Sequence, residues 1–112
     1  MPSVQGDGLQ SRDFTYVANA VQAVVRAADA PDAVGRVYNV GNGETTTILE
    51  LVRRLNEILG CDCKPEHGPA RAGDVRHSQA DISRARRDLG YEPAVSFVEG
   101  LRRTVAALQA AG

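Results

Sequence analysis

The sequence lacks several features that would assign it to a common class of protein. It has no tryptophan, and it has no run of about 18 apolar residues that would span a membrane. Residues 1–6 carry no apolar stretch of the signal-peptide type, so we expect a cytoplasmic protein. The net charge of -1 argues against a broad nucleic-acid-binding surface. With 112 residues, the chain is long enough for one domain and too short for two.

Motifs of catalysis are missing as well. There is no G-x-G-x-x-G or P-loop for a nucleotide phosphate, because residues 6–8 and 41–43 are only G-x-G. There is no H-E-x-x-H, and no spacing typical of a Ser-His-Asp triad stands out. The residues therefore offer groups for binding, and we assign no catalytic residue.

Lysine is nearly absent, because Lys64 is the only one among 13 basic residues and the other twelve are arginine. Arginine forks suit phosphate and carboxylate groups. Base composition of the gene explains such a bias equally well in a chain rich in Ala, Gly and Val. The bias alone implies no ligand.

Only two cysteines are present, and they form the C-x-C pair Cys61 and Cys63. Zinc sites usually have C-x₂₋₄-C spacing and four ligands. On a strand, C-x-C spacing would point the two thiols to opposite faces. We therefore expect reduced, structural cysteines and no metal site.

The pattern of apolar residues predicts a mixed α/β chain with few strands and about four helices. A short strand or an extended piece is expected over 13–17, and strands are expected over 36–40 and 61–66. Helices are expected over 19–30, 48–60, 81–90 and from 97 onward. Thr47 with Glu50, and Ser96 with Glu99, form capping boxes that begin two of the helices. The strands are too few for an independent sheet, as though part of a fold were missing.

Two segments carry groups suited to an anionic ligand. Arg12 precedes the extended segment 13–17, and Arg71 lies three residues before Asp74 on a loop. Two arginines converging on a cleft would suit a diphosphate, and Asp74 would suit the hydroxyls of an attached ribose. The alternative is that these are surface arginines paired with local acids, such as Arg12 with Asp13 or Arg71 with Asp74.

Three motifs occur in a characteristic order: "GDGLQSRDFTYV" over 6–17, "VYNVGNGETTTILELV" over 37–52, and "RAGDVRHSQADISRARRDLGYEP" over 71–93. Together they resemble the C-terminal part of an extended short-chain dehydrogenase/reductase, and most closely the nucleotide-sugar epimerases of the UDP-glucose 4-epimerase type. The resemblance implies a partial Rossmann-like fold, in which "YNVG" is a late strand of the dinucleotide-binding sheet. It also implies that Arg12 and Arg71 contact the diphosphate of a UDP-sugar, that Asp74 contacts the ribose, and that Phe14 lines the nucleotide part of the cleft.

The chain departs from this family in the residues that carry the reaction. The family's N-terminal half supplies a glycine-rich NAD loop and a Tyr-x-x-x-Lys pair. None of Tyr16, Tyr38 and Tyr91 has a lysine four residues on. We therefore expect residues 1–112 to be a single C-terminal substrate-binding region without the NAD-binding half, inactive alone, and binding a UDP-sugar weakly and no NAD.

Other functions stay open at this stage. The chain is alternatively a fragment of a dTDP- or UDP-sugar dehydratase or decarboxylase, because these enzymes share the motifs. A third hypothesis is a non-catalytic interaction or self-association module derived from the fold, acting as a homodimer or pairing with the missing N-terminal half. A small arginine-rich phosphate or nucleic-acid binder is disfavoured by the net charge.

Overall fold

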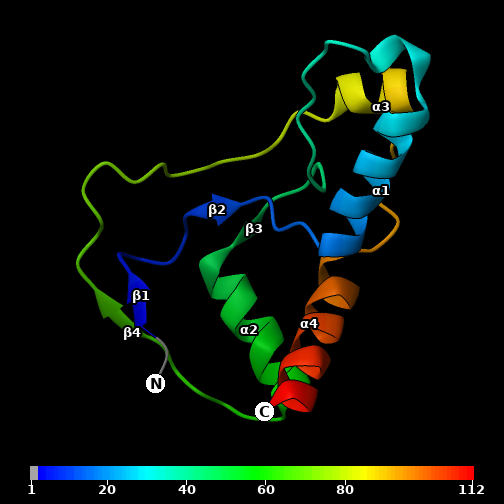
Figure 1. The fold of residues 1–112 in the computed structure, drawn as a ribbon. Coiled ribbons are helices and arrows are strands. Elements are labelled where there is room, and N and C mark those ends of the chain that lie inside the picture. The colour runs from blue at the N-terminus through cyan, green and yellow to red at the C-terminus, as the bar shows by residue number, and fades with distance from the viewer. Residues whose placement is uncertain (1–2) are drawn as a thin grey trace.

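The computed structural model describes residues 3–112, which form an α/β arrangement of helices and very short strands (Figure 1). Within this range there are four α-helices and one 3₁₀ helix: α1 (Val17–Asp29), η1 (Pro31–Ala33), α2 (Ile48–Leu59), α3 (Ser83–Leu89) and α4 (Phe97–Ala111). The strands are β1 (Ser3–Gln5), β2 (Ser11–Arg12), β3 (Thr46–Thr47) and β4 (Glu66–Gly68). The expected α/β class and the number of helices are confirmed. No described helix is long and apolar enough to cross a membrane.

Local signals at the helix ends explain why the helices were predictable. Thr47 Oγ1 accepts a hydrogen bond from the amide of Glu50 at 3.1 Å, and Ser96 Oγ accepts one from the amide of Glu99 at 3.2 Å. These are the N-cap halves of the two predicted capping boxes. Gly60 ends α2 with φ 67°, a left-handed conformation that glycine adopts at little cost.

The strands pair as two separate two-stranded sheets. β1 runs parallel to β4, with Val4 opposite His67, and β2 runs antiparallel to β3, with Ser11 opposite Thr47. The strand expected over 61–66 lies at 66–68 instead, and residues 61–65 have no regular structure. The two cysteines are therefore not on a strand.

Neither of the segments 13–17 and 36–40 forms a hydrogen-bonded strand in the described chain. Residues 13–16 have no regular structure, because pairing with β3 ends at Arg12 and the Asp13 carboxylate binds loop amides instead. Residues 36–40 are not a hydrogen-bonded strand, because no other described segment pairs with them. They still alternate as a strand would: Tyr38 and Val40 pack against the core, whereas Val37 is 80% exposed.

The main core is small and lies between α1 and α3. Its buried members are Ala23, Ile82, Ala85, Leu89 and Tyr91. Figure 1 shows α1 beside α3 at one end of the molecule and α2 beside α4 at the other, and both of these helix pairs are in contact. The helices thus form two groups joined by long connecting segments.

The chain is more open than a self-contained domain of its length. Its radius of gyration is 16.4 Å, whereas a compact domain of this length has about 13 Å. Its accessible surface is 7342 Å², against about 6,000 Å² for a folded monomer of this mass. Much of the apolar surface that would normally form a core is therefore exposed, including Val17, Val21, Val24 and Val25 on α1.

Candidate functional site

Arg12 is held in place by backbone pairing and by contacts with the 71–78 segment. It is the last residue of β2, opposite Thr46 of β3. Its Nη1 donates to the carbonyl oxygens of Ser11, at 2.7 Å, and Arg76, at 3.4 Å. Its Nη2 donates to Asp74 Oδ1 at 2.8 Å. The guanidinium side chain is 28% exposed, so it is fixed in direction yet open to a ligand.

Asp13 joins three segments that are distant in sequence. Its carboxylate accepts hydrogen bonds from the amides of Asn42 at 2.8 Å, Gly43 at 3.0 Å and Ala80 at 3.4 Å. Gly41 fits against this junction, because a Cβ there would lie 2.7 Å from both Asp13 Oδ2 and Ala80 Cβ. The single carboxylate therefore fixes the 41–43 turn and the 78–81 segment next to Arg12.

These segments surround an open, mainly polar hollow of about 520 Å³. It is lined by Arg12, Asp13 and Thr15, by residues 39–41 and by residues 78–81. Gly41, which lines this hollow, is held by Tyr91, whose buried hydroxyl donates to the Gly41 carbonyl oxygen at 2.7 Å. Burial raises the pKa of Tyr91, so its hydroxyl keeps its proton as a donor.

Arg71 and Asp74 line a second, smaller hollow of about 120 Å³, together with Gln5, Gly6 and Arg76. Arg71 is exposed, and its carbonyl oxygen accepts from the amide of Asp74 at 3.2 Å. The structure thus brings Arg12 and Asp74 together and places Arg71 beside Asp74, but it does not place the two arginines in one hollow. Within the described chain, neither Arg12 with Asp13 nor Arg71 with Asp74 forms an ion pair; Asp74 pairs with Arg12 instead.

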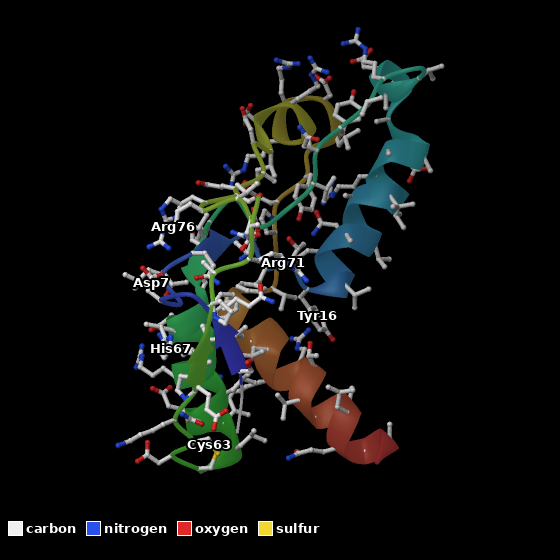
Figure 2. All side chains as sticks on the ribbon, turned by 90° about the vertical axis from the view of Figure 1, so that its left-hand side faces the viewer. Asp7, Tyr16, Cys63, His67, Arg71 and Arg76 are labelled. Atoms are coloured by element: carbon white, nitrogen blue, oxygen red, sulfur yellow. The ribbon has the colours of Figure 1, made fainter. Side chains whose placement is uncertain are left out.

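The same segment is tied to the N-terminal strand region by a second ion pair. Arg76 donates through both terminal nitrogens to the two carboxylate oxygens of Asp7, each at 2.8 Å. Figure 2 shows Asp7 and Arg76 together at one edge of the molecule, with Arg71 nearer its middle. The hydrogen bonds from Arg76 and from the Leu9 amide lower the pKa of Asp7 from 3.8 to about 2.

Phe14 lies apart from these charged groups. Its ring packs against Phe97, with ring centroids 5.6 Å apart, and both line an apolar hollow of about 200 Å³ with Tyr16, Gly100 and Leu101. The structure therefore places Phe14 at the junction with α4, outside the hollows that contain Arg12, Arg71 and Asp74.

Sequence reasoning missed two of the groups that organise the site. Asp13 has partners 29, 30 and 67 residues away, so no short motif marks it. Ser11 Oγ lies 2.7 Å from His77 Nδ1, which attaches the 76–78 segment to β2. Among the described residues, no group of three or more His, Cys, Asp or Glu is arranged to hold a metal ion.

Comparison with known proteins assigns this arrangement to a family of sugar-nucleotide enzymes. The family model described as GDP-mannose 4,6 dehydratase matches residues 1–104. The chain is 41% identical over 100 residues to UDP-glucose 4-epimerase of Mycolicibacterium smegmatis, covering 89% of the chain and 32% of that protein. It is 39% identical over 102 residues to dTDP-glucose 4,6-dehydratase of Streptomyces griseus, covering 90% of the chain and 31% of that protein.

Solved structures agree with this assignment. UDP-glucose 4-epimerase of Thermotoga maritima with UDP-glucose matches at a TM-score of 0.89 and 40% identity, over 97% of this chain and 35% of that one. UDP-glucuronic acid 4-epimerase of Bacillus cereus, in complex with UDP-glucuronic acid and NAD, matches at a TM-score of 0.91 and 31% identity. The match covers 99% of this chain and 36% of that one. The chain belongs to the NAD-dependent nucleotide-sugar epimerase/dehydratase family of extended short-chain dehydrogenases/reductases. It spans about a third of the length of these relatives.

Proposed function

We propose that the chain is the sugar-nucleotide-binding part of an epimerase- or dehydratase-type enzyme, corresponding to the C-terminal third of its relatives. The observation that carries this proposal is the position of Arg12, fixed by β2 and by the 71–78 segment but open to solvent beside a polar hollow. Relatives with the same backbone bind UDP-glucose and UDP-glucuronic acid.

The Arg12–Asp74 pair suggests how such a ligand binds. A diphosphate carries more negative charge than one carboxylate, and a guanidinium binds phosphate through parallel hydrogen bonds. The diphosphate would take the place of Asp74 at Arg12, and Arg71, exposed on the neighbouring hollow, would bind its other side. The Asp74 carboxylate, released from Arg12, would accept hydrogen bonds from the ribose hydroxyls.

The residues present do not fit NAD, although family members bind it. The sequence contains no G-x-G-x-x-G loop and no Tyr-x-x-x-Lys pair. No step of a hydride-transfer reaction is therefore assigned to this chain, and we expect the 112-residue protein alone not to convert UDP-glucose or UDP-galactose. Turnover of either sugar nucleotide by the purified chain would contradict this expectation.

The reaction class of the complete enzyme is left open by the same reasoning. The relatives include an epimerase, a dTDP-glucose dehydratase and UDP-glucuronic acid decarboxylase 1 of Arabidopsis thaliana, which is 38% identical over 103 residues. The sugar nucleotides named for all three relatives carry a nucleoside diphosphate, which each enzyme has to bind. We therefore propose a nucleotide-anchoring role and name no sugar.

Titration with UDP tests the proposal, followed by calorimetry or by NMR shifts because we expect affinity near millimolar. A charge-assisted hydrogen bond contributes about 1.5–3 kcal/mol, so Arg71→Ala should weaken UDP binding about ten- to more than a hundredfold. Arg102→Ala is the matched control, because Arg102 is exposed on α4, away from both hollows. Binding of UDP that is equal in the wild type and both variants would overturn the proposal.

A second function has one observation in its favour. Four valines on one face of α1 are 54–71% exposed, which suits association with another polypeptide. Such association is compatible with nucleotide anchoring, because none of the four valines lines either of the hollows that contain Arg12 and Arg71.

A further inference from the structure

The only two cysteines of the chain lie together on its surface. Cys61 and Cys63 are both exposed, and their Sγ atoms are 3.7 Å apart. The C-x-C spacing would separate the thiols on a strand, but residues 61–65 are irregular and both sulfurs lie on the same side of the loop. Figure 2 shows Cys63 at the far end of the molecule, away from Arg71 and Arg76.

The loop that carries the two thiols is fixed by one side chain. Asn56 Nδ2 donates to the Cys63 carbonyl oxygen at 2.9 Å, and Asn56 Oδ1 accepts from the Cys61 thiol at 3.3 Å. The Cys61 amide donates to the Asn56 carbonyl oxygen at 3.0 Å, at the end of α2. The two sulfurs are therefore positioned by α2 and not by each other alone.

Their separation matches one edge of a tetrahedral thiolate site. With zinc–sulfur bonds of about 2.3 Å, two sulfurs of a tetrahedron lie about 3.8 Å apart. We propose that Cys61 and Cys63 form half of a thiolate site for a thiophilic divalent cation such as Zn²⁺, and that the same two cysteines of a second copy complete it.

A second copy of the chain is required because two cysteines supply only two of the ligands that the cation needs. Structural zinc sites are closed by four protein ligands, and the described part of this chain offers no group of three or more candidate ligands. A two-fold axis through the cation would place four thiolates around it, and the exposure of both sulfurs leaves them accessible to a partner. The site lies apart from the nucleotide-binding residues, so it does not depend on the proposed function.

Binding must be coupled to proton release. Each thiol loses its proton to solvent as its sulfur binds the cation, so affinity should increase as the pH rises from about 6 to about 8.

The test uses the full chain, purified with a chelator and a phosphine reductant and titrated with Zn²⁺ against a competing chromophoric chelator. We expect half an equivalent of Zn²⁺ per chain, and a doubling of mass by light scattering that EDTA reverses. Cys61→Ser and Cys63→Ser should each weaken binding at least tenfold, whereas His67→Asn, the control for the histidine nearest in sequence to the two cysteines, should not. Co²⁺ substitution should give sulfur-to-metal charge-transfer absorption.

The metal-to-chain ratio decides the outcome even where the metal-free chain already associates through other surfaces. One equivalent of Zn²⁺ per chain, or binding that persists in the Cys61→Ser/Cys63→Ser double variant, overturns the proposal. Half an equivalent of Zn²⁺ per chain, bound at least tenfold more weakly by each single variant, supports it.

Discussion

The guanidinium of Arg12 donates to the carboxylate of Asp74 at 2.8 Å across 62 residues of sequence. The pair joins the end of β2 to the loop that carries Arg71. The groups proposed to bind a sugar nucleotide are therefore neighbours even when no nucleotide is bound. It also implies competition, because Arg12 cannot bind a phosphate and Asp74 equally well at once.

Replacement of Asp74 by asparagine separates the two roles of this carboxylate. The neutral amide would release Arg12 and would remove a charged acceptor for the ribose. We expect Asp74→Asn to weaken UDP binding about tenfold, which corresponds to about 1.4 kcal/mol, and to leave the affinity for inorganic diphosphate unchanged or higher. NMR shift titrations with the two ligands measure both affinities. Equal weakening of both ligands would show that Asp74 does not contact the nucleoside.

Asp13 should be the most sensitive side chain of the site for stability. Its carboxylate accepts from the amides of Asn42, Gly43 and Ala80, and an amide side chain accepts less strongly. We expect Asp13→Asn to lower the free energy of unfolding by about 1.5–3 kcal/mol, measured by urea denaturation. Asp32→Asn is the matched control, because Asp32 is exposed on η1, away from this junction. A loss no larger than that of the control would show that the junction is not formed in solution.

Gly41 tests the same junction by steric means. A Cβ there would lie 2.7 Å from Asp13 Oδ2 and from Ala80 Cβ, both of which belong to fixed segments. We expect Gly41→Ala to cost about 1–3 kcal/mol of unfolding free energy, as overpacking does. Gly68→Ala is the comparison, because the nearest heavy atom to a Cβ there is 3.8 Å away. Equal stability of the two variants in urea would show that the 41–43 turn lies farther from the 78–81 segment.

The helices were predictable because their signals are local, whereas the strands and the junction were not. Thr47 and Ser96 cap helices from within four residues of chain, and Gly60 ends one in a left-handed conformation. Segment 36–40 has the composition of a strand but no partner among the described residues. Its side chains still alternate between the core and solvent, although no sheet is formed. Asp13 could not be found because its partners are far away in sequence.

The exposed valine face of α1 predicts association. Val17, Val21, Val24 and Val25 lie on one side of the helix, opposite the buried Asn19 and Ala23. We expect dimers or larger assemblies at high concentration by light scattering, and a shift to monomer in a Val21→Glu/Val25→Glu variant.

That variant should remain folded, because both side chains are more than half exposed. The matched control adds the same charges at Ala106 and Gln109, which are exposed on α4. Wild-type chain that stays monomeric over a wide range of concentration would contradict the prediction, as would equal association of the two charged variants.

The Asp7–Arg76 pair predicts a pH dependence whose sign is fixed by the pKa shift. The carboxyl pKa is lowered from 3.8 to about 2, chiefly by the hydrogen bond from Arg76 and then by that from the Leu9 amide. A lowered pKa means that the folded chain binds the proton less well than the unfolded chain does. The pair therefore stabilises the fold fully above about pH 4, and this contribution is lost as the pH falls toward about 2.

Asp7→Asn isolates the charge, because an Asn oxygen can still accept from the Leu9 amide. We expect the variant to have a lower thermal midpoint than the wild type at neutral pH, with a difference that stays constant down to about pH 5 and disappears near about pH 2. Both side chains are about half exposed, so about 1 M salt should reduce the difference. Arg76→Gln should reproduce the same profile by removing the other partner. An Asp7 carboxyl that titrates near 3.8 by NMR would show that the 71–78 segment is not held to residue 7 by this ion pair.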